Sequence, residues 1–93
     1  MESENKKMWL IFFGEAVSER RSYISMTQQQ LADQSGLYRT YIGDIEKGSR
    51  NVTVTTVNQI AAALETTSAR IFSQADKKLA DWKRDQAAKA KRG

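Results

Sequence analysis

A short segment of the 93-residue chain, Arg39 to Asp44, carries the side chains best suited to reading the edges of DNA bases. The guanidinium of Arg39 is a planar fork of N–H donors that matches the N7 and O6 acceptors of guanine. Thr40 can offer a methyl group to thymine and a hydroxyl to a base or a phosphate. Because its charge would repel phosphates, Asp44 either holds Arg39 in place or accepts from a cytosine amino group. We therefore interpret Arg39, Thr40 and Asp44 as base-reading residues.

Polar residues on both sides of this segment have the chemistry to hold a sugar–phosphate backbone. Tyr38 cannot cap a helix as Ser, Thr, Asp or Asn does, but its hydroxyl can donate to a phosphate. The stretch after residue 46 adds Lys47, Ser49, Arg50 and Asn51. A second interpretation stays open, in which Thr40 and Tyr41 belong to an ordinary exposed or half-buried helix face.

Two short helices joined by a tight turn must position these side chains. Thr27 and Gln30 have the spacing of a capping box, in which each side chain accepts from the other residue's backbone N–H. Leu31 and Ala32 give the helix that follows an inward face. Gly36 ends this helix, because glycine takes a left-handed conformation at little steric cost.

The second of these helices carries the base-reading segment. Ile42 and Ile45, three residues apart, form its buried face, and Gly48 ends it. Gly43 is unusual inside a helix, where it costs about 1 kcal/mol relative to Ala. We interpret it as allowing close approach, either of DNA or of the preceding helix. Such a pair, with a polar and basic second member, is typical of a DNA-reading helix-turn-helix.

A family resemblance rests on two runs of residues, Arg39–Ile42 (RTYI) and Ile45–Asn51 (IEKGSRN). The segment resembles the helix-turn-helix of phage-repressor and Xre-type regulators. More narrowly, it resembles the controller proteins of bacterial restriction–modification systems, although stand-alone regulators share the same signature. The resemblance covers roughly Phe13 to Phe72. It implies an all-α fold, a compact five-helix repressor-like domain with a short C-terminal basic tail that is either helical or disordered.

The resemblance also implies roles for residues elsewhere in the chain. Arg21 would pair with Glu46 and tie the first helix to the end of the recognition helix. The segment 52–72 would be where two subunits meet, with Leu64, Ile71 and Phe72 at the interface. The residues expected on the DNA backbone are then Gln28, Tyr38, Tyr41, Lys47, Ser49, Arg50 and Asn51.

Three residues depart from the family's usual pattern. Tyr38 stands where Ser, Thr or Asp commonly caps the recognition helix, so the start of that helix is expected to be shifted or capped in another way. Arg20 and Ser25 stand where an aliphatic residue and a glycine are commoner. Ser25 leaves the shape of the turn after the first helix open.

The N-terminal part predicts a helix from about Lys6 to about Ser22, with Gly14 as its weak point. Trp9, Phe13 and Val17 follow at i, i+4 spacing and share a face. Two interpretations of this apolar start are open. Trp9 and Phe13 close the core, or Trp9 contributes with Leu10 and Phe12 to a dimer contact.

The C-terminal part predicts a helix over about 52–64, with Thr53 as its N-cap and Val54, Val57, Ile60, Ala61 and Leu64 as its buried stripe. Thr67 can cap a last short helix. We expect a DNA-binding and dimerisation domain over residues 1–73 and a basic helix or tail over 74–93. Leu79 and Trp82 allow weak docking of that tail, which is expected to be disordered beyond Asp85 and to add a salt-sensitive, sequence-independent attraction to DNA.

Composition narrows the class of protein. The chain has 93 residues, enough for one domain, and contains no Cys and no His. Disulfides, thiolate metal sites and imidazole bases are therefore excluded, and we expect no metal, no cofactor and no enzymatic activity. No apolar run is long enough to be a signal peptide or to span a membrane, so a cytoplasmic, nucleoid-associated protein is expected.

Two functions from different classes remain. The first is a sequence-specific transcription regulator that binds double-stranded DNA as a homodimer, with dimers paired on adjacent sites, and needs no small-molecule ligand. The second is an antitoxin or adaptor that uses the same fold to hold a protein partner. Binding to one operator, or a stable complex with a second protein, distinguishes them.

Overall fold

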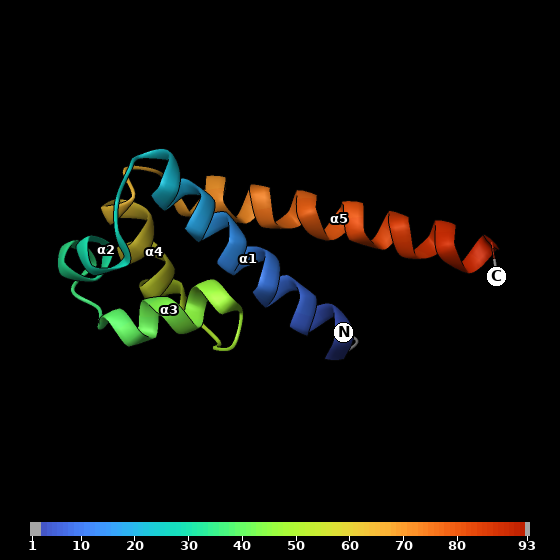
Figure 1. Cartoon of the computed structure of the whole chain (residues 1–93), viewed down its shortest axis with the longest axis horizontal. Coiled ribbons are helices and arrows are strands. Elements are labelled where there is room, and N and C mark those ends of the chain that lie inside the picture. Colours follow the sequence, from blue (N-terminus) through green and yellow to red (C-terminus); the bar gives the residue numbers. More distant parts are fainter. Residues whose placement is uncertain (1–2, 93) are drawn as a thin grey trace.

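The computed structural model describes residues 3–92, which form α1 (Ser3–Tyr23), α2 (Gln28–Ser35), α3 (Arg39–Lys47), α4 (Val54–Ala63) and α5 (Ser68–Arg92). No strand occurs within these residues, and the all-α prediction is confirmed. Helices α2, α3 and α4 gather at one end of the molecule, while α1 and α5 run away from it toward the two termini (Figure 1). No helix of residues 3–92 is long and apolar enough to cross a membrane.

One apolar core joins all five helices. Each helix contributes to it a side chain that is no more than 2% exposed, namely Phe13 of α1, Leu31 of α2, Ile42 of α3, Ile60 of α4 and Ile71 of α5. Their burial removes from water the apolar faces that the sequence spacing indicates, which is the main force holding α1 against the other helices.

An aromatic cluster extends this core between α1 and α5. Trp9 stacks on Phe13 with ring centroids 5.3 Å apart, and Phe72 lies 5.8 Å from Trp9 and 6.0 Å from Phe13. The indole N–H of Trp9 donates to Asp76 over 3.3 Å. Of the two interpretations of the apolar N-terminus, the structure therefore places Trp9 and Phe13 in core packing.

The end of α1 and the turn that follows it show how two departures from the family pattern are accommodated. Ser25 has a φ of 57°, so the left-handed backbone for which glycine is usual is kept with a serine in its place. Arg20 donates through Nε to the carbonyl of Leu64 over 2.9 Å and through Nη2 to that of Glu65 over 2.8 Å. It thus binds the end of α4, a role that an aliphatic side chain cannot perform.

The structure contradicts the burial expected of Val54 and the dimer contact expected of Leu64 and Ile71, while Leu64 is buried as its place in the stripe predicts. Val54 is 79% exposed, because it is the first residue of α4 and its side chain is not packed against the other helices. Leu64 and Ile71 are 0% and 2% exposed, so both are core residues of one subunit and offer no surface to a second. Of the three residues expected at a dimer interface, Phe72 alone remains half-buried.

Helix α5 differs most from the expectation. It is continuous across the expected domain boundary at residues 73 and 74, and residues 86–92 are helical rather than disordered. The stretch QAAKAKR contains only good helix formers and continues a helix already nucleated by Ile71 and Ala75 in the core. Lys78 ties α5 to α1, because its ammonium lies 2.8 Å from Glu19 and 3.4 Å from Glu15. The Glu19 hydrogen bond, against the effect of burial, raises the pKa of Lys78.

Candidate nucleic-acid interface

Helix α2 and the turn after it place α3 at the surface. The Thr27 hydroxyl accepts from the backbone N–H of Gln30 over 3.0 Å, and the Gln30 side chain accepts from the N–H of Thr27 over 2.8 Å, which is the expected capping box. Gly36 ends α2 with a φ of 77°. Helix α3 then packs inward through Ile42 and Ile45, which are 0% and 1% exposed.

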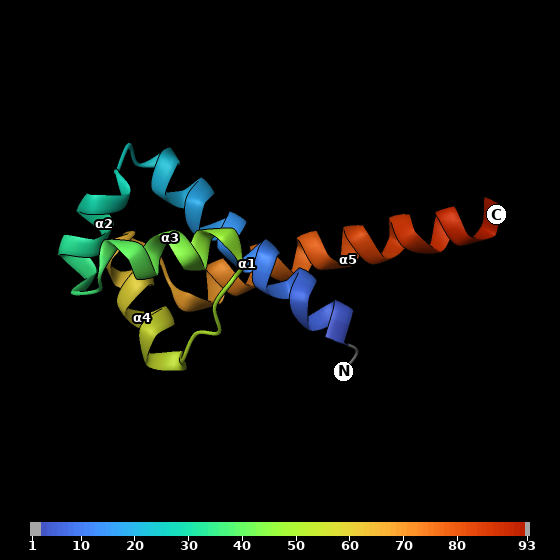
Figure 2. The same cartoon turned by 60° about the horizontal axis from the view of Figure 1, so that its bottom comes forward.

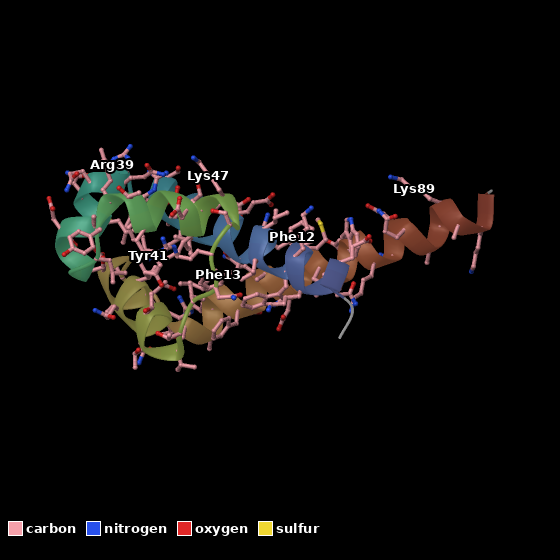
Figure 3. All side chains as sticks on the ribbon, turned by 90° about the horizontal axis from the view of Figure 1, so that it is seen from below. Phe12, Phe13, Arg39, Tyr41, Lys47 and Lys89 are labelled. Carbon is pink, nitrogen blue, oxygen red and sulfur yellow. The ribbon has the colours of Figure 1, made fainter. Side chains whose placement is uncertain are left out.

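The outer face of α3 carries the base-reading candidates. Arg39 and Thr40 are exposed. Figure 3 shows Arg39 and Lys47 at the two ends of α3, both projecting from the same side of the molecule. Figure 2 shows α3 crossing in front of the other helices, with no segment covering it. A helix held by one buried face with a basic opposite face has the geometry to enter a major groove.

A half-buried ion pair fixes α3 to α1. Glu46 accepts from Arg21 Nε over 2.7 Å and from Arg21 Nη2 over 3.0 Å, and the two side chains are 7% and 17% exposed. The hydrogen bond to Glu46, opposed by burial, raises the pKa of Arg21. Arg21 also donates to the carbonyl of Met26 over 2.9 Å. The sequence expectation for Arg21 and Glu46 agrees with this geometry.

Gln28 belongs to the same network. Its amide donates to Glu46 over 3.0 Å. In this structure the side chain that was expected on a DNA phosphate therefore also holds the carboxylate of α3. The first backbone N–H groups of a helix have no partner within it, so the start of α2 can still bind an anion.

Arg50 is held over α3 by two neighbours. Its guanidinium lies 4.9 Å from the centroid of the Tyr41 ring, and its Nη2 lies 3.5 Å from the Asp44 carboxylate. Ser49 closes the loop by donating its hydroxyl to the Asp44 carbonyl over 3.1 Å. Asp44 therefore positions Arg50, and the expectation that it holds Arg39 was wrong. Arg39 lies five residues before it, on a different side of the helix.

These side chains surround one shallow hollow. It is lined by Tyr38, Thr40, Tyr41, Asp44, Ser49, Arg50 and Asn51, all of which were singled out from the sequence. Tyr38 precedes α3 without capping it and is 86% exposed, so its hydroxyl is free to meet a phosphate. Arg39, Lys47 and Gln28 lie outside the hollow.

Two lysines near this hollow were missed. Lys6 and Lys7 of α1 border a second shallow depression together with Ser49, Arg50 and Asn51. The sequence offers a signal, since they are adjacent cations at the start of a helix. That signal was not sufficient, because only the packing of α1 along α3 brings the chain's N-terminal helix beside the loop after α3.

No contact within residues 3–92 explains why position 43 is a glycine. A Cβ placed on it would meet no atom within 4 Å, so it does not allow close approach of α2, and that alternative was wrong. Gly43 lies four residues from both Arg39 and Lys47, on the exposed side of α3. Its cost in helix stability is therefore not offset by any contact inside the molecule.

No group of three or more potential metal ligands occurs among the described residues.

A capped helix, a left-handed glycine and a second helix with a basic outer face together define a helix-turn-helix protein of the DNA-binding class.

Comparison with known proteins agrees with this class. A helix-turn-helix family model matches residues 24–71. The control protein C.SmaI of Serratia marcescens is 42% identical over 60 residues, which are 64% of this chain and 71% of that protein. The chain belongs to the helix-turn-helix family of restriction–modification control proteins.

Two solved structures of controller proteins are similar in fold. The controller protein C.AhdI from Aeromonas hydrophila superposes with a TM-score of 0.66 at 35% identity, over 67% of this chain and 94% of that one. The controller protein C.Esp1396I, solved as a tetramer in complex with its natural 35-base-pair operator, gives a TM-score of 0.70 at 34% identity, over 76% of this chain and 93% of that one.

Proposed function

We propose that the protein is a sequence-specific transcription regulator that binds a near-palindromic operator as a homodimer, with dimers able to pair on adjacent sites. We propose that it serves as the controller of a restriction–modification system or as a similar autoregulator. The exposed basic face of α3, fixed by Arg21 and Glu46, carries this proposal. It is supported by the operator complex of C.Esp1396I. The role is regulatory and not catalytic, and the site of action is the cytoplasm and its nucleoid.

In this proposal each subunit divides its contacts between bases and backbone. Arg39 and Thr40 read base edges in the major groove, with Asp44 beside them as an acceptor for a cytosine amino group. The residues that hold the sugar–phosphate backbone are Gln28, Tyr38, Tyr41, Lys47, Ser49, Arg50 and Asn51. Two copies of α3 enter successive major grooves about 34 Å apart.

Selection of binding sites from a random duplex pool tests this function. We expect enrichment of a near-palindrome whose half-sites lie about one helical turn apart. If no sequence is enriched and binding disappears with modest salt, the regulator proposal fails. A stable complex with a second protein would then support the antitoxin or adaptor function.

Replacing Arg39 with Ala tests base reading. We expect a loss of about 1 to 3 kcal/mol for each half-site of the selected operator and relaxed preference at one base pair of each half-site, because each subunit loses one bidentate contact to guanine. Selection with the variant protein measures that preference. The control is Arg70→Ala, which removes the same charge at an exposed position on α5. Equal weakening on all sequences by Arg39→Ala would contradict a base-reading role.

Replacing Gly43 with Ala tests why a glycine lies in α3. The free energy of unfolding is expected to rise by about 1 kcal/mol, because Ala favours a helix and the position is open. Operator binding is expected to weaken, since the added methyl group keeps α3 away from the groove. Thermal denaturation and a binding titration measure the two effects. Unchanged operator affinity would show that no DNA atom approaches Gly43 closely.

A further inference from the structure

The last ten residues of α5 form a helical arm that projects from the body of the protein. Ala75 is the last residue of α5 in the core, and Leu79 and Trp82 are half-buried. From Lys83 to Lys91 every side chain is exposed. In Figures 1 and 2, α5 continues past α1 and ends away from the other helices. We call residues 83–92 the C-terminal arm.

The C-terminal arm carries the whole net charge of the chain. The sequence has 15 Lys and Arg, 11 Asp and Glu, and a formal net charge of +4. Five of the cations and one of the acids lie in KRDQAAKAKR, so the arm has a formal charge of +4 and the other 83 residues sum to zero. Any long-range attraction of the molecule to a polyanion is therefore concentrated in the arm.

The composition of the arm indicates which kind of partner it can bind. Its apolar residues are alanines alone, and it has no Leu, Ile, Val, Met or aromatic residue. An interfacial membrane helix needs Trp, Phe or Leu on one face, and a helix that docks in a protein groove needs apolar anchors at helical spacing. Closely spaced cations on a helix with no apolar face suit the phosphates of DNA.

The arm and α3 both present a cation on the same side of the molecule. Figure 3 shows Lys89 projecting toward the side from which Arg39 and Lys47 also project. The arm spans about 15 Å at the rise of an α-helix. Because it continues a docked helix, it needs no separate nucleation and loses little freedom on binding.

We propose that the C-terminal arm binds the sugar–phosphate backbone of DNA that flanks each half-site. This inference rests on the proposed regulator function and adds to it a sequence-independent contact outside the operator core. The arm lies beyond the part of the chain that matches the helix-turn-helix family model, which ends at residue 71.

The test compares two pairs of substitutions on two duplexes. Lys83→Gln with Lys89→Gln removes two arm charges, and Gln keeps nearly the helix propensity of Lys. The control, Arg70→Gln with Lys77→Gln, removes two exposed charges of α5 near the core. Each protein is titrated at several salt concentrations against a duplex that ends at the selected operator and against one with about ten flanking base pairs on each side.

We expect the unsubstituted protein to bind the longer duplex more tightly. Because the homodimer has two arms, the arm variant removes four charges and should lower the slope of log K against log salt on that duplex by about 3 to 4, since each phosphate contact contributes about 0.9. It should lose much of the advantage of the longer duplex, although Arg84 and Lys91 remain, and it should keep the base preference of the original protein. Circular dichroism checks that α5 stays helical. The control variant should leave the difference between the two duplexes unchanged.

Two results would overturn the proposal while leaving the regulator function intact. One is an arm variant that keeps the full advantage of the longer duplex, and the other is a control variant that loses as much as the arm variant. Failure of the unsubstituted protein to select any operator is a separate result, which counts against the regulator function itself.

Discussion

Replacement of Glu46 by Ala is expected to lower the free energy of unfolding by about 3 kcal/mol. Glu46 accepts from Arg21 over 2.7 Å and 3.0 Å and from Gln28 over 3.0 Å. Arg21 is 17% exposed, so removing the carboxylate leaves a largely buried guanidinium without its ion-pair partner. Urea denaturation of the variant and the unsubstituted protein, with equal m-values, measures the difference.

A surface ion pair of similar length supplies the control. Glu19 lies 2.8 Å from Lys78 but is 59% exposed, so Glu19→Ala should cost under about 1 kcal/mol. The double variant Arg21→Leu with Glu46→Leu should recover much of the loss, because no buried charge is left without a partner. If Glu46→Ala costs no more than Glu19→Ala, the Arg21–Glu46 pair does not fix α3 to α1.

Features that depend on a few neighbouring residues could be predicted from the sequence. The capping box of Thr27 and Gln30 and the left-handed Gly36 follow from hydrogen bonding and sterics within one turn of chain. Most of the buried stripe of α4 follows from helical spacing. The base-reading and backbone roles of the site residues remain proposals, although the structure gathers seven of them around one hollow.

Features that depend on how helices pack could not be predicted. Leu64 and Ile71 were assigned to a dimer interface because apolar residues at helical spacing look alike whether one subunit or two bury them. Asp44 was given the wrong partner because the loop after α3 folds Arg50 back over Tyr41. The C-terminal arm was expected to be disordered because its composition is polar, and α5 extends through it as a continuous helix.

Gly14 shows the same limit most clearly, and replacing it with Ala has a large expected effect. Its low helix propensity makes Gly14 a weak point of α1 in the sequence, but a Cβ there would lie 2.7 Å from the Glu46 carbonyl oxygen and closer still to that of Ile45. Both obstacles are backbone atoms, which cannot rotate away. We expect a net loss of about 2 to 3 kcal/mol in the free energy of unfolding, even after the gain in helix propensity.

The same substitution at Gly43 is the matched control, because both glycines are helical and only Gly14 faces another helix. Gly14→Ala should lower the denaturation midpoint and Gly43→Ala should raise it, so the sign of the change separates packing from helix propensity. Operator binding should not follow stability. At a temperature where it remains folded, Gly14→Ala retains Arg39 and its base preference, whereas the more stable Gly43→Ala binds less well. A Gly14→Ala protein as stable as the original would mean that α1 and α3 do not pack at this distance, and the position of α3 would then rest on its buried Ile42 and Ile45 and on the Arg21–Glu46 pair.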